Sequence, residues 1–128
     1  MISKDLVNIT NTTKNRLPRL SFESIKDAIL GKNYELSIAV VGSSRMTKLN
    51  LIYRNKKGST DVLSFGLEKN SGEIVFDLEK VRSKAKLHDL SFEKYFKKLF
   101  IHGLLHLKGF EHGSRMKVEE LKFENNFN

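Results

Sequence analysis

The chain contains no cysteine and no tryptophan among its 128 residues. Without cysteine, a disulfide framework, a cysteine-ligated zinc site, an iron–sulfur cluster and a thiol nucleophile are all excluded. Any metal ion that the protein binds must therefore be held by histidine, aspartate, glutamate or backbone oxygen.

Long apolar segments are also missing: no run approaches the ~20 residues of a membrane span, and the first ten residues lack the apolar core of a signal peptide. We therefore expect a soluble, cytoplasmic protein without a membrane partner. The length fits one domain of ~100–150 residues, so a single domain over residues 1–128 is predicted. A hydrophobic content of 39%, with nine phenylalanines, argues against disorder.

The formal net charge of +8 is unevenly distributed. Residues 1–64 carry 11 Lys and Arg against 5 Asp and Glu, whereas residues 65–128 carry 12 against 10. A basic surface attracts polyanions, so the charge suggests nucleic acid as a partner. Lysine outnumbers arginine by 17 to 6, however, and an AT-rich genome produces the same composition without functional meaning. Charge alone leaves nucleic-acid binding open.

Hydrophobic periodicity and turn residues predict alternating strands and helices, and hence an α/β or α+β domain. We expect strands at 6–10, 35–41, 60–65 and 72–77, and helices at 17–30, 44–54, 78–88, 91–109 and 114–124. The short connection between the last two strands predicts an antiparallel pair. The expected helix caps are Ser21 or Ser24 with Gly31 for the first helix, Ser43 or Ser44 for the second, and Ser91 with Gly109 for the fourth.

The predicted helix 91–109 changes character along its length. Its second half is apolar on all sides apart from Gly103 and two histidines, and such a helix is buried on all sides. We therefore expect it to be the central helix, carrying His102 and His106 into the interior or onto the wall of a cleft.

Three of the four histidines lie in the segment HGLLHLKGFEH, residues 102–112. His102 and His106 are four positions apart, so on a helix they share one face. Gly109 can adopt a positive φ that ends the helix and turns the chain back, which lets His112 join them. Three neutral imidazoles can hold one Zn²⁺ ion and leave a fourth position for water.

Two other interpretations of this segment are weaker. Isolated histidines in an apolar helix are usually hydrogen-bonded core residues, but three buried imidazoles without a metal would each need partners for two nitrogens. The same spacing occurs in zinc peptidases with the pattern HExxHxxGxxH, in which the glutamate is the general base. Here Gly103 occupies that position and cannot accept a proton. His88 lies outside the pattern and is expected at the surface.

The segment 102–112 resembles the signature HGxLHLxG[YF]DH of the YbeY family, the bacterial metal-dependent endoribonucleases of rRNA maturation. Residues 49–65, LNLIYRNKKGSTDVLSF, are similar to a second block of that family, and SGEIVFD at 71–77 is similar to a third. The blocks occur in the family's order, and the resemblance spans roughly residues 35–125.

This resemblance implies a small mixed β-sheet of about four strands covered by helices. It implies one zinc ion held by His102, His106 and His112 plus water, beside a cleft lined by the TDVLSF strand and Arg54. The implied activity is cleavage of single-stranded RNA in 16S rRNA 3′-end maturation and ribosome quality control. The implied partners are the ribosome, ribosomal proteins or an assembly GTPase.

Arg54 ends a predicted helix directly before a basic loop, and we expect it to clamp a phosphate during phosphodiester hydrolysis. The resemblance supports a catalytic role, whereas a surface arginine near a helix C-terminus is the plainer interpretation. No single-strand stacking signature is present in the sequence, and Tyr53 and Phe110 are no more than possible stacking residues.

Further candidates for RNA contact are Lys56 and Lys57 in the basic loop, with Thr60 and Ser64 in the TDVLSF block. Each lysine taken singly is more simply explained as a solvated surface residue. Salt dependence of RNA binding reports how many such side chains act.

The sequence departs from the family pattern at four positions. Glu111 and Glu73 stand where the family usually has aspartate, and Ser59 and Gly66 stand where it often has proline. None of these changes removes a predicted ligand. Two other function classes stay open. One is a ribosome-assembly or RNA-binding factor with a non-catalytic zinc, whose fourth ligand could be Glu111 or another carboxylate. The other is a hydrolase of another phosphoester or amide.

Overall fold

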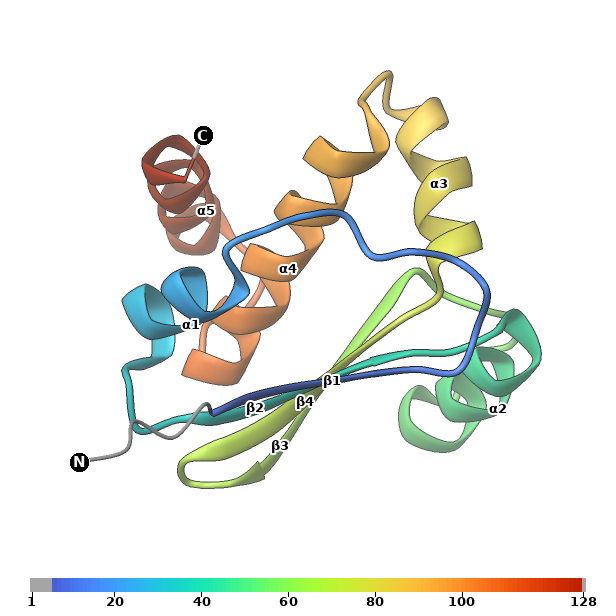
Figure 1. The fold of residues 1–128 in the computed structure, drawn as a ribbon, viewed down its shortest axis with the longest axis horizontal. Coiled ribbons are helices and arrows are strands. Elements are labelled where there is room, and N and C mark those ends of the chain that lie inside the picture. Colours follow the sequence, from blue (N-terminus) through green and yellow to red (C-terminus); the bar gives the residue numbers. More distant parts are fainter. Residues whose placement is uncertain (1–5, 128) are drawn as a thin grey trace.

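The computed structural model describes residues 6–127, which form a mixed sheet with helices packed on it (Figure 1). The elements are β1 (Val7–Asn11), α1 (Phe22–Leu30), β2 (Glu35–Val40), α2 (Ser43–Arg54), β3 (Val62–Glu68), β4 (Ser71–Phe76), α3 (Leu78–Leu87), α4 (Phe92–Lys108) and α5 (Ser114–Asn126). The predicted α+β class and the sheet of about four strands are confirmed. No helix within residues 6–127 is long and apolar enough to cross a membrane.

The strand order in the sheet is β1-β2-β4-β3. β1 pairs with β2 and β2 pairs with β4 in parallel, whereas β3 pairs with β4 antiparallel, as the short connection predicted. β4 is thus an interior strand, and its buried run Ile74, Val75 and Phe76 is typical of a strand covered on both faces. β3 lies at an edge of the described sheet, so within residues 6–127 its outer side is not paired with another strand.

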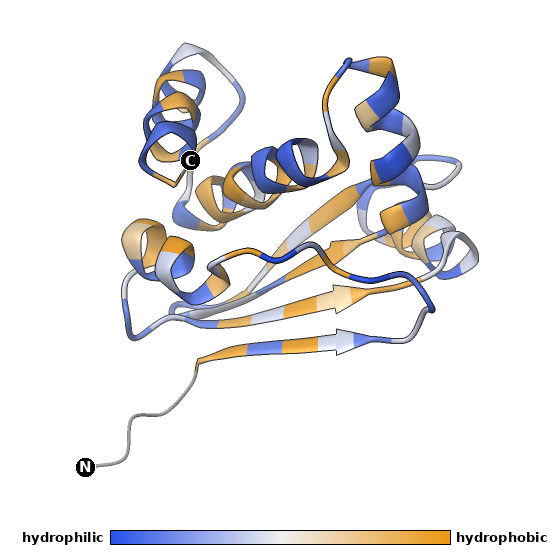
Figure 2. Cartoon of the chain, turned by 45° about the horizontal axis from the view of Figure 1, so that its top comes forward, coloured by the Kyte–Doolittle hydropathy of each residue, from blue (hydrophilic) through white to orange (hydrophobic). Residues whose placement is uncertain are grey.

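The two faces of the sheet are covered by different helices. Because strand side chains alternate, Ile74 and Phe76 join the larger core beneath α1, α3, α4 and α5, whereas Val75 joins a smaller core with Met46 of α2 and Leu63 of β3. Figure 2 shows hydrophobic residues along the strands and through α4. α4 packs against α1, α3, α5, β3 and β4, so the prediction that it is the central helix is confirmed.

Close packing of α4 on the sheet depends on a glycine. A Cβ atom at Gly103 would lie 3.0 Å from both Ile74 Cδ1 and Ser64 Oγ. The absence of a side chain at this position lets α4 lie directly against β3 and β4. The neighbouring His102 is thereby held beside β3.

Several expected boundaries were wrong. The first helix begins at Phe22 and not at residue 17, because Pro18 biases Leu17 toward extended backbone and Leu17 and Leu20 pack against the core before the helix starts. Ser21 is at the N-cap position but makes no side-chain cap bond, and Gly31 ends the helix as expected.

The predicted cap of α2 was also wrong. Gly42 occupies the N-cap position, because the Ser43 hydroxyl is committed elsewhere and donates to Asp77 Oδ2 at 2.7 Å. Asp77 is not part of β4, as its predicted range implied, but is the N-cap residue of α3, where its side chain accepts from Lys80 N. β3 begins two residues later than expected, at Val62; the Asp61 side chain, just before it, accepts a hydrogen bond from Tyr95 of α4.

The aromatic core beneath α4 provides a test of this packing. Phe96 is fully buried and its ring contacts those of Phe22, Phe76 and Phe92. We expect Phe96→Ala to lower the free energy of unfolding by about 3–5 kcal/mol, the cost of a large core cavity. Leu87→Ala removes an 83% exposed side chain and should change it by less than about 0.5 kcal/mol. Urea denaturation measures both, and equal effects would contradict the described core.

Candidate metal centre

Three histidines converge at the C-terminal end of α4. His102, His106 and His112 each offer a ring nitrogen, and these three atoms lie within 4.8 Å of one another. The Nε2 atoms of His102 and His106 are 3.0 Å apart, so the two residues share one helix face as their spacing predicted. This group could hold a metal ion.

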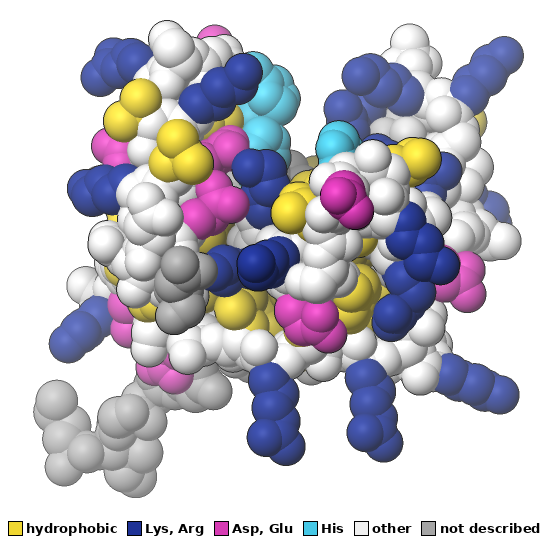
Figure 3. Space-filling view, turned by 90° about the horizontal axis from the view of Figure 1, so that it is seen from above, with side chains coloured by type: hydrophobic (Ala, Val, Ile, Leu, Met, Phe, Trp, Pro, Cys, Tyr) yellow, Lys and Arg dark blue, Asp and Glu magenta, His cyan; other side chains and the backbone are white. Residues whose placement is uncertain are grey.

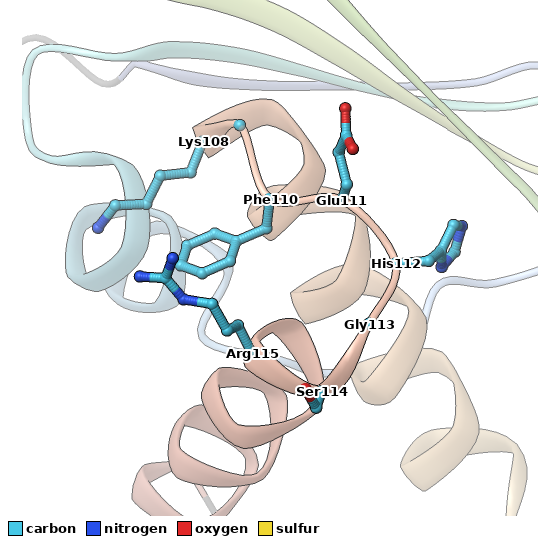
Figure 4. Close-up of a pocket in the computed structure, with 8 residues that line it drawn as sticks. Lys108, Phe110, Glu111, His112, Gly113, Ser114 and Arg115 are labelled. Atoms are coloured by element: carbon cyan, nitrogen blue, oxygen red, sulfur yellow. The ribbon is translucent and has the colours of Figure 1, made fainter.

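The turn that ends α4 brings in the third histidine. Gly109 has φ 110° in the left-handed region, and the N–H groups of Gly109 and Phe110 donate to the carbonyls of His106 and Leu105 at 3.0 Å. This is the Schellman pattern, which satisfies carbonyls at a helix end and reverses the chain. The loop that follows carries His112 back toward α4, with Lys108, Phe110 and Arg115 on its other side (Figure 4).

Both helix histidines have their second ring nitrogen engaged. Nδ1 of His102 lies 2.7 Å from Oε1 of Glu120 on α5, and Nδ1 of His106 lies 3.0 Å from the carbonyl oxygen of Phe110. A carboxylate and a carbonyl only accept hydrogen bonds, so each Nδ1 carries the proton. In its neutral form each ring therefore presents an Nε2 lone pair, which is the tautomer that a metal ligand needs.

The two Nε2 atoms, both without a proton in this tautomer, lie 3.0 Å apart. Two acceptors at this distance repel unless a cation lies between them, either a shared proton or a metal ion. Tetrahedral coordination with Zn–N bonds of ~2.0–2.1 Å separates ligand nitrogens by roughly 3.3 Å. The donor set and the closest nitrogen pair therefore fit a metal ion, and all three members of the group are imidazoles.

Burial supports the neutral form of His106. Burial is the largest cause that lowers the pKa of His106, followed by the neighbouring His102, while the hydrogen bond to Phe110 acts in the opposite direction. A lowered pKa reduces the competition between protons and a metal ion for this ring.

Glu111 does not supply a fourth ligand in this arrangement. It is absent from the ligand group found among the described residues, and its carboxylate leaves the loop in a different direction from His112 (Figure 4). Three protein ligands without a fourth are typical of catalytic zinc sites, whereas structural sites are usually closed by four.

The histidines form one wall of a cleft of about 620 Å³. The cleft follows the outer edge of β3 and is lined by Tyr53, Arg54, Thr60, Asp61, Val62, Leu63, Ser64, Phe65, Lys84, Leu99, His102, His106 and His112. Figure 3 shows histidine side chains at a hollow in the molecular surface, with Lys and Arg side chains over much of the same face. A cleft of this size accommodates a ligand as large as a nucleotide.

The structure brings together some of the predicted site residues and leaves others apart. Arg54, the last residue of α2, lines the cleft with Thr60 and Ser64, although the Ser64 hydroxyl already donates to the Gly103 carbonyl at 3.4 Å. Lys56 and Lys57 are exposed in the following loop and do not line the cleft.

His88, which was expected at the surface, is exposed at the end of α3 and stacks on Tyr95. Among the described residues, no ring contact links His88 to the three clustered histidines.

Sequence reasoning missed two parts of the site. One is Glu120, because a carboxylate on a largely polar helix has no sequence pattern that predicts its contact with a histidine. The other is Asp61, which accepts a hydrogen bond of 2.9 Å from the Tyr95 hydroxyl and lies 3.7 Å from Lys84 Nζ. Burial, and then the Asp61 charge, raise the pKa of the Tyr95 hydroxyl, so it stays a hydrogen-bond donor. Asp61 belongs to the TDVLSF block, and its place in that block is the sequence feature that could have identified it as a site residue.

Known proteins are similar to this chain in sequence and in fold. A family model described as endoribonuclease YbeY matches residues 3–126. The protein named endoribonuclease YbeY from Aliarcobacter butzleri is 38% identical over 127 residues, covering 91% of this chain and 89% of that protein. The protein of the same name from Wolinella succinogenes is 35% identical over 125 residues, covering 91% and 88%.

A solved structure is similar as well. The solution structure of a Thermotoga maritima protein superposes with a TM-score of 0.65 at 25% sequence identity, covering 94% of this chain and 88% of that chain. The match of the family model over nearly the whole length, together with these relatives, confirms the resemblance carried by the histidine and TDVLSF motifs. This chain belongs to the YbeY family of endoribonucleases.

Proposed function

We propose that this protein is a metal-dependent endoribonuclease that hydrolyses phosphodiester bonds in single-stranded RNA. The observation that carries the proposal is the convergence of three imidazoles, two of them with Nε2 lone pairs 3.0 Å apart, on a cleft that also contains Arg54. Family membership supports the reaction class.

Zinc is the metal that we propose, with His102, His106 and His112 as its ligands. An all-imidazole set with three members suits Zn²⁺. Held by these residues, a zinc ion would supply a Lewis acid for the phosphate and would make water acidic enough to act as a nucleophile near neutral pH.

The protein's own side chains have separate roles in this proposal. Glu120 and the Phe110 carbonyl orient the two imidazoles of α4. Arg54, at the opposite wall of the cleft, binds a non-bridging phosphate oxygen through its guanidinium and offsets the charge that develops on phosphorus. Thr60 and Ser64 line the same cleft, where their hydroxyls can contact the RNA backbone.

The substrate within the cell follows from the family resemblance. We propose rRNA as the substrate in 16S rRNA 3′-end maturation and ribosome quality control, with the ribosome, ribosomal proteins or an assembly GTPase as partners and the cytoplasm as the location. The basic surface, with a net charge of +8, supports an RNA ligand. The competing function is a zinc-containing assembly factor that binds RNA without cutting it, and cleavage assays distinguish the two.

Cleavage by matched histidine variants tests the function. We expect wild-type protein to cleave a single-stranded RNA, His112→Ala to lose cleavage and His88→Ala to retain it, because His88 is an exposed histidine outside the cluster. Gel analysis of end-labelled RNA measures all three, after identical purification so that a contaminating nuclease appears in every lane. Equal cleavage by all three proteins, or none by wild type, would favour the assembly-factor function.

The role of Glu120 in orienting His102 can be separated from its role in packing α5 on α4. We expect Glu120→Ala to weaken Zn²⁺ binding by about 10–100-fold, the usual effect of losing a carboxylate that orients a ligand. Glu124→Ala is the matched control, because Glu124 also joins α5 to α4, 3.7 Å from Lys98, without touching a histidine. Chelator competition measures both affinities; equal losses would show that Glu120 acts only through helix packing.

Arg54 is expected to act on the reaction and not on the metal. We predict that Arg54→Ala lowers kcat/KM for RNA cleavage by about 100-fold or more, comparable to the loss of one transition-state donor, with one zinc ion per chain retained. Arg45→Ala removes an exposed arginine from the same helix and should leave cleavage within about twofold of wild type. Unchanged cleavage by Arg54→Ala would contradict this role.

A further inference from the structure

An aromatic ring lies open to solvent in the wall of the cleft. Tyr53, the penultimate residue of α2, is 62% exposed and lines the cleft that contains the three histidines. Because most of the ring is exposed, its burial contributes little to the stability of the fold, and the core does not require an aromatic residue here.

The ring is held in place from one side. Its centroid lies 4.8 Å from that of Phe65, at an interplanar angle of 59°. Phe65 is half-buried on β3 and packs against the smaller core formed by Val41, Met46, Leu63 and Val75. Tyr53 is therefore supported by a residue that is itself fixed, while most of its own surface remains accessible.

The aromatic pair and the histidines lie on different sides of β3. Ser64 points toward α4, because its hydroxyl donates to the Gly103 carbonyl. Phe65 is the next residue along the strand and points to the other face, toward α2, as strand alternation requires. The cleft thus follows the edge of β3 from the histidines on the α4 side to Tyr53 on the α2 side.

Positive charge accompanies this aromatic wall. Arg54 directly follows Tyr53, and Lys84 also lines the cleft. The one carboxylate among the lining residues, Asp61, already accepts from Tyr95 and lies near Lys84. Cationic side chains in the same groove as an accessible aromatic ring are the combination by which proteins hold single-stranded nucleic acid, with phosphates on the cations and bases on the ring.

We propose that Tyr53, backed by Phe65, is a stacking site for one nucleobase of a single-stranded RNA that crosses the edge of β3. In this arrangement, the base next to the phosphate at the histidines unstacks from the adjacent bases and stacks on the tyrosine ring. The identity of the ligand as RNA rests on the proposed function. Stacking accepts every base, because each has a π-face, so the site favours unpaired RNA without reading its sequence.

A coupling experiment between a protein ring and an RNA base tests this proposal. A fluorescein-labelled single-stranded RNA of about 12 nucleotides, within the span of one single-strand binding site, is prepared with an abasic residue at each position in turn. Binding to the zinc-loaded protein is followed by anisotropy. Wild type should bind the RNA that is abasic at one particular position about tenfold more weakly than the intact RNA. Tyr53→Leu should bind the intact RNA about tenfold more weakly and lose no further affinity for that abasic RNA.

Two further variants show whether the aromatic ring itself is responsible. Tyr53→Phe keeps the ring and should behave like wild type. Ile52→Ala removes the 70% exposed neighbour of Tyr53, which does not line the cleft, and should retain the full response to the abasic residue. Circular dichroism verifies that each variant is folded.

The outcomes separate this proposal from the proposed function, since cleavage of the same RNA is followed in parallel. If the RNA is cleaved but no abasic position weakens binding in a way that depends on Tyr53, the stacking site is overturned and the nuclease function stands. If one abasic position weakens binding in a way that depends on Tyr53 but the RNA is not cleaved, the stacking site is supported and the nuclease function is overturned. An effect of Ile52→Ala equal to that of Tyr53→Leu overturns the stacking site in favour of a broader contact on α2. No RNA binding by wild type overturns both.

Discussion

The hydrogen bonds donated by Nδ1 of His102 and by Nδ1 of His106 are the constraint on which the rest of the site depends. Each bond holds a proton on Nδ1 and leaves Nε2 unprotonated in the neutral ring, and the two Nε2 atoms lie 3.0 Å apart. Neither partner belongs to the histidine's own helical turn: Glu120 comes from α5, and the Phe110 carbonyl comes from the turn after Gly109. The packing of α5 and the end of α4 therefore determine whether two imidazoles can bind a cation together.

The same elements place the histidines where RNA can reach them. Gly103 allows α4 to approach β3 closely, since a Cβ there would meet Ser64 and Ile74. β3 is the edge strand of the described sheet, so the histidine face opens onto a cleft and is not enclosed by another strand. Arg54 reaches the same cleft because α2 covers the opposite face of the sheet and ends beside β3. Packing on both faces of one strand thus assembles the site.

Local signals were enough to predict the histidine cluster. The four-residue spacing of His102 and His106, with Gly109 at the helix end, defines its geometry within the segment 102–112. Contacts between distant segments were not predictable: Asp61 meets Tyr95 across 34 positions, and His102 meets Glu120 only after α5 has docked on α4. The first helix and the cap of α2 were mispredicted because tertiary contacts outweighed the local pattern. Leu17 and Leu20 pack against the core ahead of Phe22, and Ser43 donates to Asp77.

Metal dependence of catalysis is the central claim, and stoichiometric reconstitution tests it most directly. Metal-free protein is titrated with Zn²⁺ while the rate of cleavage of a single-stranded RNA and the amount of bound zinc are measured together. The account predicts no cleavage without metal and a rate that rises with occupancy to a plateau at one zinc ion per chain. Full cleavage by the metal-free protein, or a rate that does not follow occupancy of a single site, would contradict it.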